Sequence, residues 1–249
     1  MATFVLVHGS WFGSWCWEKV VPLLEQQGHR VAAPDLPGYG QDQTPPREIT
    51  LQHFADRVCR VLDAQAEPVV LVGHSRGGVV ITQAAEYRPD KIQTLVYVCA
   101  FLPRNGESLL QLAQQDRETL IFPHLTFAED RGYVAIKDEG SGAIKEVFCG
   151  QCSDLDLARA TPRLVPDPLA PVVTPVHTTE ANFGRIQRVY IECLRDRAIG
   201  PGLQRQMYTA VPCHQVISMD TDHSPFLSAP EELAAHLISV APPSRVAVA

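Results

Sequence analysis

Several features that would place a protein in a common class are missing from this 249-residue sequence. No apolar run approaches the ~18 residues that a transmembrane helix needs, so we expect no membrane span. There is no run of lysine and arginine, and a formal net charge of −7 argues against a nucleic-acid partner. Met1 leads directly into an apolar stretch without the basic segment of a signal peptide, so we expect no signal peptide.

Cysteines are present, but not in the spacing of a disulfide scaffold or a complete zinc site. The seven cysteines are an odd number and mostly lie in apolar segments, which predicts free buried thiols in a reducing compartment and hence a cytoplasmic protein. Cys149 and Cys152 form a C-x-x-C motif that could be a redox pair or half of a zinc site. No second such motif and no strand-then-helix pattern accompany it, so we favour a structural role and expect no metal.

The most informative stretch that is present is residues 69–78. Four apolar residues lead into a Gly-x-Ser-x-Gly motif, and an apolar segment with helical character follows. Strand, tight turn and helix form the context of the nucleophile elbow, in which a strained turn exposes a serine above the sheet. Gly73 and Gly77 are needed because a Cβ at either position would collide with the strand or helix that it faces. Ser75 is therefore the candidate nucleophile.

Short apolar strands alternate with helical segments over most of the chain. We predict strands at residues 4–7, 30–33, 69–72, 92–100, 188–193 and 215–218. We predict helices at residues 15–27, ended by Gly28, at 51–66, directly after the elbow, near 203 and at 230–240. This alternation predicts an α/β fold with a mostly parallel central sheet covered by helices on both faces. We expect one domain over residues 1–249, with a frayed tail from residue 242.

The alternation stops at about residue 104 and resumes after residue 179. Within this insertion we predict a helix near Leu109, a hairpin of residues 125–128 and 133–137, a helix near Asp156 and a Pro-rich run at 162–175. A long irregular insertion between two strands of a sheet is usually functional, often as a lid. Residues 104–179 are therefore expected to form a cap.

A serine nucleophile needs a base, and the base is oriented by an acid. In the α/β-hydrolase fold, these residues follow in the order nucleophile, acid, base. His223 alone among the nine histidines lies directly after a late strand and before the final helix, so it is the candidate base. Asp196 follows the preceding strand and is the candidate acid, although its flanking arginines would also suit a surface ion pair. Asp220 and Asp222 are alternatives, but both lie close to His223 along the chain.

The developing oxyanion needs two N–H donors, and the fold places them after the nucleophile and after the first strand. These positions predict the backbone N–H groups of Arg76 and Ser10. Surplus apolar side chains of the cap, together with two aromatic residues of the sheet domain, are expected to form a mostly apolar pocket. The predicted pocket residues are Trp11, Phe101, Phe122, Leu125 and Phe127. Trp17 is expected to pack in the core.

Residues 8–17 read His-Gly-Ser-Trp-Phe-Gly-Ser-Trp-Cys-Trp. This stretch resembles the His-Gly-x-x-x-Gly-Ala-Trp-x-Trp signature of the plant methylesterase and hydroxynitrile lyase group of α/β-hydrolases. The segments around Asp196 and His223 are similar to that group as well, and the His-Gly-Ser-Trp opening is closer to its bacterial carboxylesterase branch. The resemblance implies a Ser-His-Asp hydrolase with a cap over its pocket, and it places Cys149 and Cys152 in a cap helix.

Two positions separate hydrolases from lyases within this group. The resemblance implies that lyases carry a threonine where this chain has Gly9, and a lysine where it has Ser224. Glycine has no side chain to bind a cyanohydrin, and serine has no charge to stabilise departing cyanide. A hydroxynitrile lyase is therefore the less favoured alternative. A non-catalytic receptor is less favoured again, because a pure binder does not need an aligned base and acid.

The sequence thus predicts a serine carboxylesterase that cleaves small to medium hydrophobic esters, such as methyl or aryl esters, through an acyl-enzyme. We expect a small-molecule ester as its partner and no cofactor, and a homodimer is left open. Arg76 stands where the group usually has Phe, Leu or Met. Its guanidinium could pair with a cap carboxylate such as Asp130, or meet an anionic substrate.

Overall fold

Six parallel strands form the central sheet in the order β2-β1-β3-β4-β8-β9. The computed structural model describes residues 1–137 and 142–241, so the tail predicted to fray lies outside the described residues. The strands are β1 (Thr3–Val7), β2 (Arg30–Ala32), β3 (Val69–His74), β4 (Ile92–Val98), β8 (Gln187–Cys193) and β9 (Gln215–Met219). The predicted mostly parallel sheet is confirmed.

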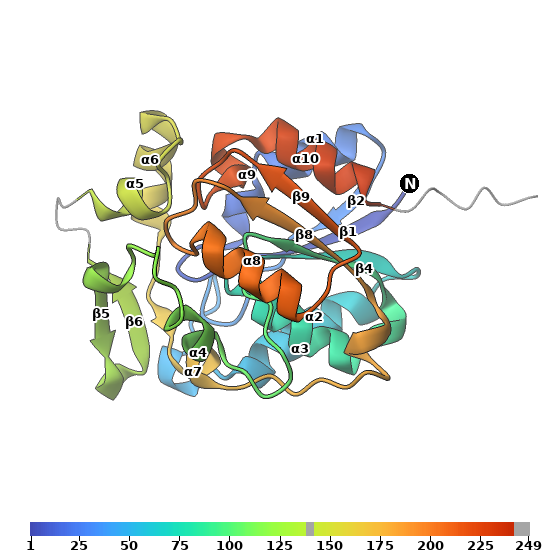
Figure 1. The fold of residues 1–249 in the computed structure, drawn as a ribbon, viewed down its shortest axis with the longest axis horizontal. Coiled ribbons are helices and arrows are strands. Elements are labelled where there is room, and N and C mark those ends of the chain that lie inside the picture. The colour runs from blue at the N-terminus through green and yellow to red at the C-terminus, as the bar shows by residue number, and fades with distance from the viewer. Residues whose placement is uncertain (138–141, 242–249) are drawn as a thin grey trace, which may run out of the picture.

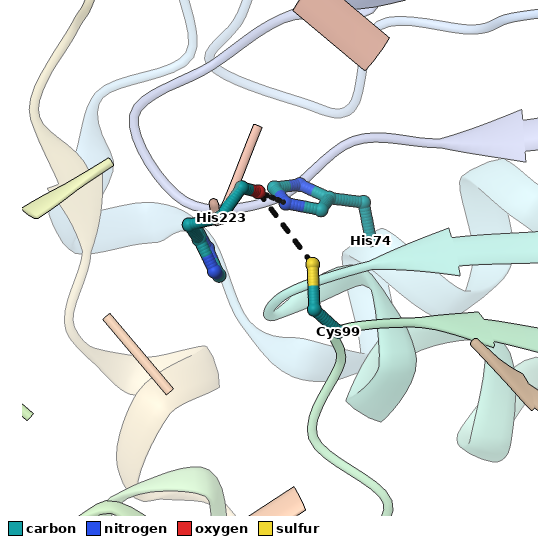
Figure 2. A group of neighbouring side chains, drawn as sticks. All are labelled: His74, Cys99 and His223. Atoms are coloured by element: carbon teal, nitrogen blue, oxygen red, sulfur yellow. Dashed lines mark hydrogen bonds between the residues drawn. The ribbon is translucent and has the colours of Figure 1, made fainter. Parts of the chain in front are cut away.

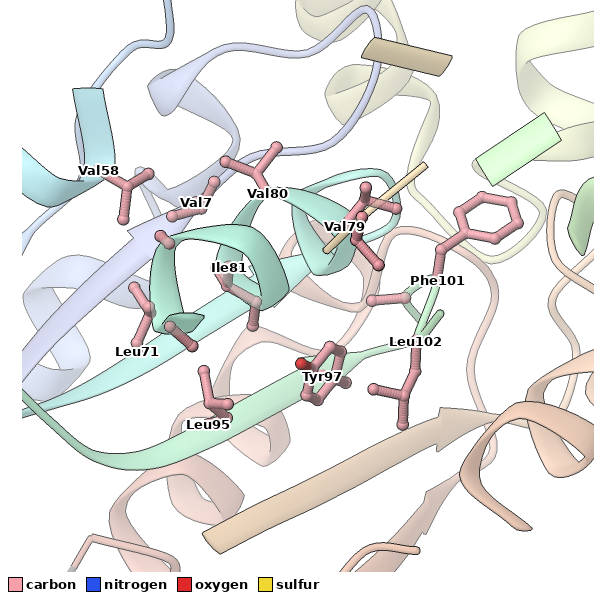
Figure 3. Packing of buried hydrophobic residues seen from close by; sticks show 14 of the residues in the cluster. Val7, Val58, Leu71, Val79, Val80, Ile81, Leu95, Tyr97, Phe101 and Leu102 are labelled. Carbon is pink, nitrogen blue, oxygen red and sulfur yellow. The ribbon is translucent and has the colours of Figure 1, made fainter. Parts of the chain in front are cut away.

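Helices cover both faces of this sheet, as Figure 1 shows. One face carries α2 (Leu51–Asp63), α3 (Gly77–Tyr87) and α8 (Pro201–Ala210), and the other carries α1 (Val20–Gln26), α9 (Pro225–Ser228) and α10 (Pro230–Ser239). Each strand contributes side chains to the hydrophobic layers on both faces of the sheet, because successive side chains point to opposite faces. In β1, Val5 and Val7 belong to the first layer, and Phe4 and Leu6 to the second. Figure 3 shows the first layer around α3.

The helix predicted at residues 15–27 is wrong in its first half. The structure has a 3₁₀ helix at Ser14–Trp17, and the α-helix begins only at Val20. Pro22 explains the break, because it has no N–H and its ring would clash with the carbonyl of the residue four positions earlier. Gly28 follows the helix with φ +78°, as predicted, and the N–H of His29 closes the end by bonding to Leu24 O. Trp17 is fully buried in the core, as expected.

Between β4 and β8 the chain forms the cap, which projects beyond one end of the sheet (Figure 1). The predicted hairpin is confirmed as β5 (Leu125–Ala128) and β6 (Tyr133–Ile136). A third strand, β7 (Asp167–Pro168), pairs with β6, although it lies inside the Pro-rich run. The cap helices are α4 (Leu109–Ala113), α5 (Ala143–Val147), α6 (Asp154–Ala160) and α7 (Ala170–Val173). Of these, α4 and α6 match the predicted helices near Leu109 and Asp156.

Short 3₁₀ helices complete the fold. Besides the one at Ser14–Trp17, they are Pro46–Glu48, Pro89–Lys91, Phe122–His124, Glu129–Arg131, Thr161–Arg163 and Phe183–Arg185. In the part of the chain that the structure describes, none of the helices has both the length and the apolar character needed to cross a bilayer.

Candidate active site

Ser75 occupies a sharp turn between β3 and α3. Its φ of 54° lies in the left-handed region, which non-glycine residues rarely adopt and which marks a strained turn. A Cβ on Gly73 would lie 2.7 Å from Gly77 O, and a Cβ on Gly77 would lie 2.7 Å from Val7 O. Both glycines are therefore required by close approach of the backbone, as the sequence predicted. The result is a serine held at the carboxyl end of the central strand.

His223 and Asp196 meet at the carboxyl ends of β9 and β8. His223 Nδ1 lies 2.7 Å from Asp196 Oδ2, and both side chains are almost fully buried. The other carboxylate oxygen, Oδ1, accepts hydrogen bonds from the N–H groups of Ala198 and Ile199 at 2.7 and 2.8 Å. Burial raises the pKa of the Asp196 carboxyl, and its hydrogen bonds with His223 and the two N–H groups act in the opposite direction. The acceptor is thus fixed on both of its oxygens.

The other acids near His223 are used elsewhere. Asp220 forms an exposed ion pair with Arg195, with two contacts of 2.6 Å. Asp222 points toward the cap and the last helices, where it accepts hydrogen bonds from Gln151 N at 2.7 Å and from Ser228 Oγ at 2.8 Å. Neither carboxylate is placed like that of Asp196 against the imidazole.

Two side chains hold the backbone of His223. Figure 2 shows His74 and Cys99 facing the carbonyl oxygen of His223, and the His74 and His223 rings lie 4.7 Å apart between centroids. His74 Nε2 lies 2.8 Å from this oxygen and Cys99 Sγ lies 3.5 Å from it. His74 directly precedes Ser75, so this contact brings the histidine loop against the nucleophile turn. Sequence reasoning missed both residues, although His74 lies inside the motif.

The same three side chains place one nitrogen or sulfur each within 4.8 Å of one another, which is close enough for a metal site. Their hydrogen bonds favour a structural reading, because His74 and Cys99 are directed at a backbone oxygen and the His223 ring is bonded to Asp196. Burial, followed by the charge of His223, lowers the pKa of His74 well below its usual value. A neutral His74 with its proton on Nε2 is what the carbonyl contact requires.

The two predicted oxyanion donors belong to residues close to Ser75: Ser10 lines the same cavity as Ser75, and Arg76 directly follows it. Arg76 lies at the start of α3, and Ser10 lies in the loop after β1. Within residues 1–137 and 142–241, neither N–H has a protein acceptor. Free N–H groups at the start of a helix and in a neighbouring loop can hold a developing negative charge.

An apolar cavity opens beside Ser75, between the sheet domain and the cap. All five side chains predicted for the pocket line it, and Phe101 N–H bonds to Ser75 O at 3.0 Å, which keeps Phe101 beside the turn. Phe122 and Phe127 are 40% and 52% exposed, so they line its outer part. Apolar residues that the sequence did not indicate complete the wall, among them Val134, Phe148, Val172, Ala198 and Ile199. The cavity suits a largely apolar ligand.

The guanidinium of Arg76 pairs with a cap carboxylate, but with a different one from the example that the sequence suggested. Asp130 lies exposed in the 3₁₀ helix of the hairpin turn. Arg76 instead lies against Asp167 of β7, with Nε 3.3 Å from Oδ1, and both side chains are buried. No sequence signal marked Asp167, because it lies in the irregular Pro-rich run.

Cys149 and Cys152 lie in the turn between α5 and α6, and not in a cap helix as the resemblance implied. Cys149 Sγ lies 3.8 Å from Ser224 Oγ, and Cys152 Sγ lies 3.6 Å from Asp222 Oδ2. The pair therefore packs the cap against the histidine loop. All seven cysteines are free thiols.

Acidification is expected to destabilise the fold through the buried histidines. Burial and the charge of Arg76 lower the pKa of His8 from 6.5 to about 3, so between these values the unfolded chain binds a proton that the folded chain does not. The free energy of unfolding must then fall with decreasing pH, by about 2 kcal/mol at pH 5 from His8 alone, and His74 adds to the effect. Urea denaturation at pH 7 and pH 5 measures this loss of free energy of unfolding. The loss should be smaller in His8→Gln than in the wild-type protein. Equal stability at both pH values would contradict this account.

The fold and the residues around Ser75 define an α/β hydrolase. The chain belongs to the Alpha/beta hydrolase family, whose sequence model matches residues 4–236. Methylesterase 9 of Arabidopsis thaliana is 32% identical over 97% of this chain and 98% of its own length. The chain spans 55 to 63% of the length of three chloroplastic relatives from the same plant, which are 34 to 35% identical to it.

Solved structures agree with the sequence relatives. Polyneuridine aldehyde esterase superposes with a TM-score of 0.86 at 27% identity, over 96% of this chain and 99% of its own. A pyrethroid hydrolase from Sphingobium faniae superposes with a TM-score of 0.85 at 26% identity, over 96% of both chains. These findings confirm the resemblance to methylesterase-like α/β hydrolases that residues 8–17 indicated.

Proposed function

We propose that this chain is a serine carboxylesterase that hydrolyses small to medium hydrophobic esters through a Ser75-His223-Asp196 triad. The observation that carries the proposal is the buried 2.7 Å contact between His223 and Asp196, at the same end of the sheet as a strained serine that lines an apolar cavity. A histidine bonded to a carboxylate through Nδ1 leaves Nε2 free to accept a proton from the serine. The methylesterase and esterase names of its relatives support the same reaction class.

In the acylation step, Ser75 Oγ attacks the ester carbonyl while His223 takes the hydroxyl proton. The N–H groups of Ser10 and Arg76 stabilise the oxyanion of the tetrahedral intermediate. His223 then protonates the leaving alcohol, and an acyl-enzyme remains on Ser75. Water attacks this ester with the same assistance, which releases the acid and restores the serine. Each proton that His223 takes is returned within the same half-reaction.

The lyase alternative is disfavoured by the space around Gly9. A Cβ at this position would lie 2.8 Å from Ser75 Cβ and 2.9 Å from His74 Nδ1. The backbone here is therefore packed directly against the nucleophile, with no room for the threonine that a lyase would carry. Ser224 is fully buried and uncharged, so it cannot stabilise cyanide.

The lining of the cavity supports the proposed substrate class. Its walls are aromatic and aliphatic, which suits the acyl or aryl part of an uncharged ester, and methyl or aryl esters of hydrophobic acids are the leading candidates. A cytoplasmic location remains part of the proposal and is supported by the seven free thiols. The homodimer stays a prediction.

The experiment that tests the function is a substrate panel of methyl, ethyl, aryl and long-chain esters, lactones and mandelonitrile. We expect the highest kcat/KM for short esters with an apolar acyl or aryl group, because these fill the cavity. Every activity should fall by about 10⁴-fold or more in Ser75→Ala. Release of cyanide from mandelonitrile without cleavage of any ester would replace the hydrolase by a lyase, and a preference for emulsified long-chain esters would indicate a lipase.

A further inference from the structure

The side chain of Arg76 contacts the loop that carries the other oxyanion donor. Its Nη2 donates a hydrogen bond to Gly9 O at 3.0 Å and lies 3.3 Å from Tyr39 Oη. The guanidinium carbon lies 4.4 Å from the centroid of the Phe54 ring. With 1% of its surface exposed, this charged group has little freedom to meet solvent, and of its nitrogens Nη2 makes the hydrogen bonds.

The contact with Gly9 O matters because of the peptide to which that oxygen belongs. Gly9 C=O and Ser10 N–H are the two ends of one planar trans peptide, so they point in opposite directions. Fixing the oxygen on the guanidinium side therefore fixes the N–H on the other side. A positive charge at the oxygen also polarises the peptide and makes its N–H a stronger donor.

A second donor reaches the same oxygen. Leu36 N–H bonds to His8 Nε2 at 3.2 Å, so the ring proton of a neutral His8 is on Nδ1, which lies 2.9 Å from Gly9 O. The carbonyl of Gly9 thus accepts hydrogen bonds from both Arg76 and His8. Two donors on one carbonyl restrict rotation of the peptide more than either would alone.

The cap holds the guanidinium from the other side. Asp167 of β7 lies 3.3 Å from Arg76 Nε, and the Tyr39 hydroxyl donates a hydrogen bond to the same carboxylate oxygen. Asp167 is fully buried and lines the cavity. Leu169, just after β7, donates its N–H to Gly132 O at 2.9 Å, which ties this strand to the hairpin. Through the ion pair with Asp167, the position of the Arg76 guanidinium therefore depends on the position of β7.

We propose that Arg76 is a positioning residue that joins the cap to the oxyanion hole: Asp167 and Tyr39 hold its guanidinium, and the guanidinium orients the Gly9–Ser10 peptide. Arg76 then serves both donors, one through its own backbone N–H and the other through its side chain. The inference rests on the proposed esterase function, because it concerns the stabilisation of a tetrahedral oxyanion. It also explains why a buried ion pair stands at a position where an apolar residue would pack.

The test is the double variant Arg76→Leu/Asp167→Leu, which removes both buried charges and so leaves neither unpaired. Rates are normalised to sites titrated with a fluorophosphonate. We expect kcat for a short aryl ester to fall about 10- to 100-fold, less than or comparable to the loss of one oxyanion donor, with KM little changed. The affinity for a trifluoromethyl ketone, which forms a tetrahedral adduct with the serine, should fall in parallel, and that for the matched methyl ketone should not.

A purely structural ion pair would give a different result. The double variant would then recover the wild-type kcat and trifluoromethyl ketone affinity, and that outcome would overturn the proposal, as would a loss of kcat with unchanged trifluoromethyl ketone affinity. Arg76→Lys is the second variant, because it keeps a positive charge beside Asp167 but lacks the planar guanidinium. We expect kcat and the trifluoromethyl ketone affinity to fall together in it, but less than in the double variant. If the double variant does not fold, Arg76→Lys decides the question, and wild-type values in it overturn the proposal.

The matched control breaks another ion pair between the cap and the sheet domain. Arg163 of the cap donates to both carboxylate oxygens of Glu18, at 2.9 and 2.6 Å. Arg163→Met/Glu18→Gln should leave kcat and the ketone affinities at wild-type values, since neither side chain contacts Gly9. Failure of the proposed esterase function can be told apart from failure of this inference alone. In the first case the wild-type protein would cleave no ester and Ser75 would not be labelled, and that result would overturn the inference as well.

Discussion

Replacement of Ser75 by alanine is expected to lower kcat for a short aryl ester by about 10⁴-fold or more. The loss is large because no other group can form the acyl-enzyme, so the remaining donors can only assist direct attack by water. The substitution should leave the fold intact, although alanine must adopt the φ of 54° that the turn imposes. A fluorophosphonate should label wild-type protein at Ser75, and mass spectrometry of the labelled peptide identifies the site.

Ser239→Ala provides the comparison, because this serine lies exposed on α10. It should keep full activity and full labelling at Ser75. Near wild-type ester hydrolysis by Ser75→Ala would refute the nucleophile assignment. Labelling of a different serine in wild-type protein would do the same.

The candidate triad residues could be predicted from the sequence because the local signals and the chain order agree. A strand, a glycine-flanked serine and a helix specify the elbow by sterics, and parallel topology then directs the acid and base loops to the same end of the sheet. The structure places Asp196 against His223, as that order predicts. Local patterns also gave the hairpin of the cap, since two short, mostly apolar segments flank the polar turn at residues 129–132.

Long-range contacts could not be read in this way. Asp167 meets Arg76 across 91 positions of the chain, and nothing in its own neighbourhood indicates a charged partner. The same holds for Cys99, whose thiol reaches the carbonyl of His223. Whether two distant residues form a buried pair depends on how separate elements pack. A single sequence shows both residues but not that they are in contact.

The sequence also did not indicate which non-glycine residues have a positive φ. Trp11 has φ 62° and Cys99 has φ 33°, although neither residue type favours the left-handed region. Both are held by their surroundings. Trp11 Nε1 donates to Val134 O of the cap at 3.1 Å and Trp11 O accepts from Val165 N at 3.0 Å, while Cys99 N donates to Ile191 O at 2.8 Å. Strain of this kind is fixed by tertiary contacts and clusters at functional sites. Trp11 thus both lines the cavity and fastens the cap.

Asp196→Asn is expected to lower kcat by about 10³- to 10⁴-fold. The hydrogen bonds around the carboxylate determine how the amide must sit. Oδ1 accepts two short bonds from the N–H groups of Ala198 and Ile199, whereas Oδ2 accepts a longer one of 3.3 Å from Gln204 besides its contact with His223. The amide oxygen should therefore stay at Oδ1, and the NH₂ group should take the place of Oδ2, facing His223. An N–H donor opposite Nδ1 forces the ring proton onto Nε2. The imidazole then cannot accept the proton of Ser75.

Asp222→Asn is the matched comparison, because this neighbouring carboxylate is also buried and also has three or more hydrogen-bond partners. Its partners are Gln151 and Cys152 of the cap, Ser224 and Ser228, so the amide should weaken the attachment of the cap, by about 1–3 kcal/mol for an unsatisfied buried group. Its kcat should change far less than that of Asp196→Asn. Both variants are assayed on the same aryl ester with thermal unfolding in parallel. The reverse ranking of kcat would assign the acid to Asp222, and the bonds of Asp196 would then serve only to hold the loop after β8.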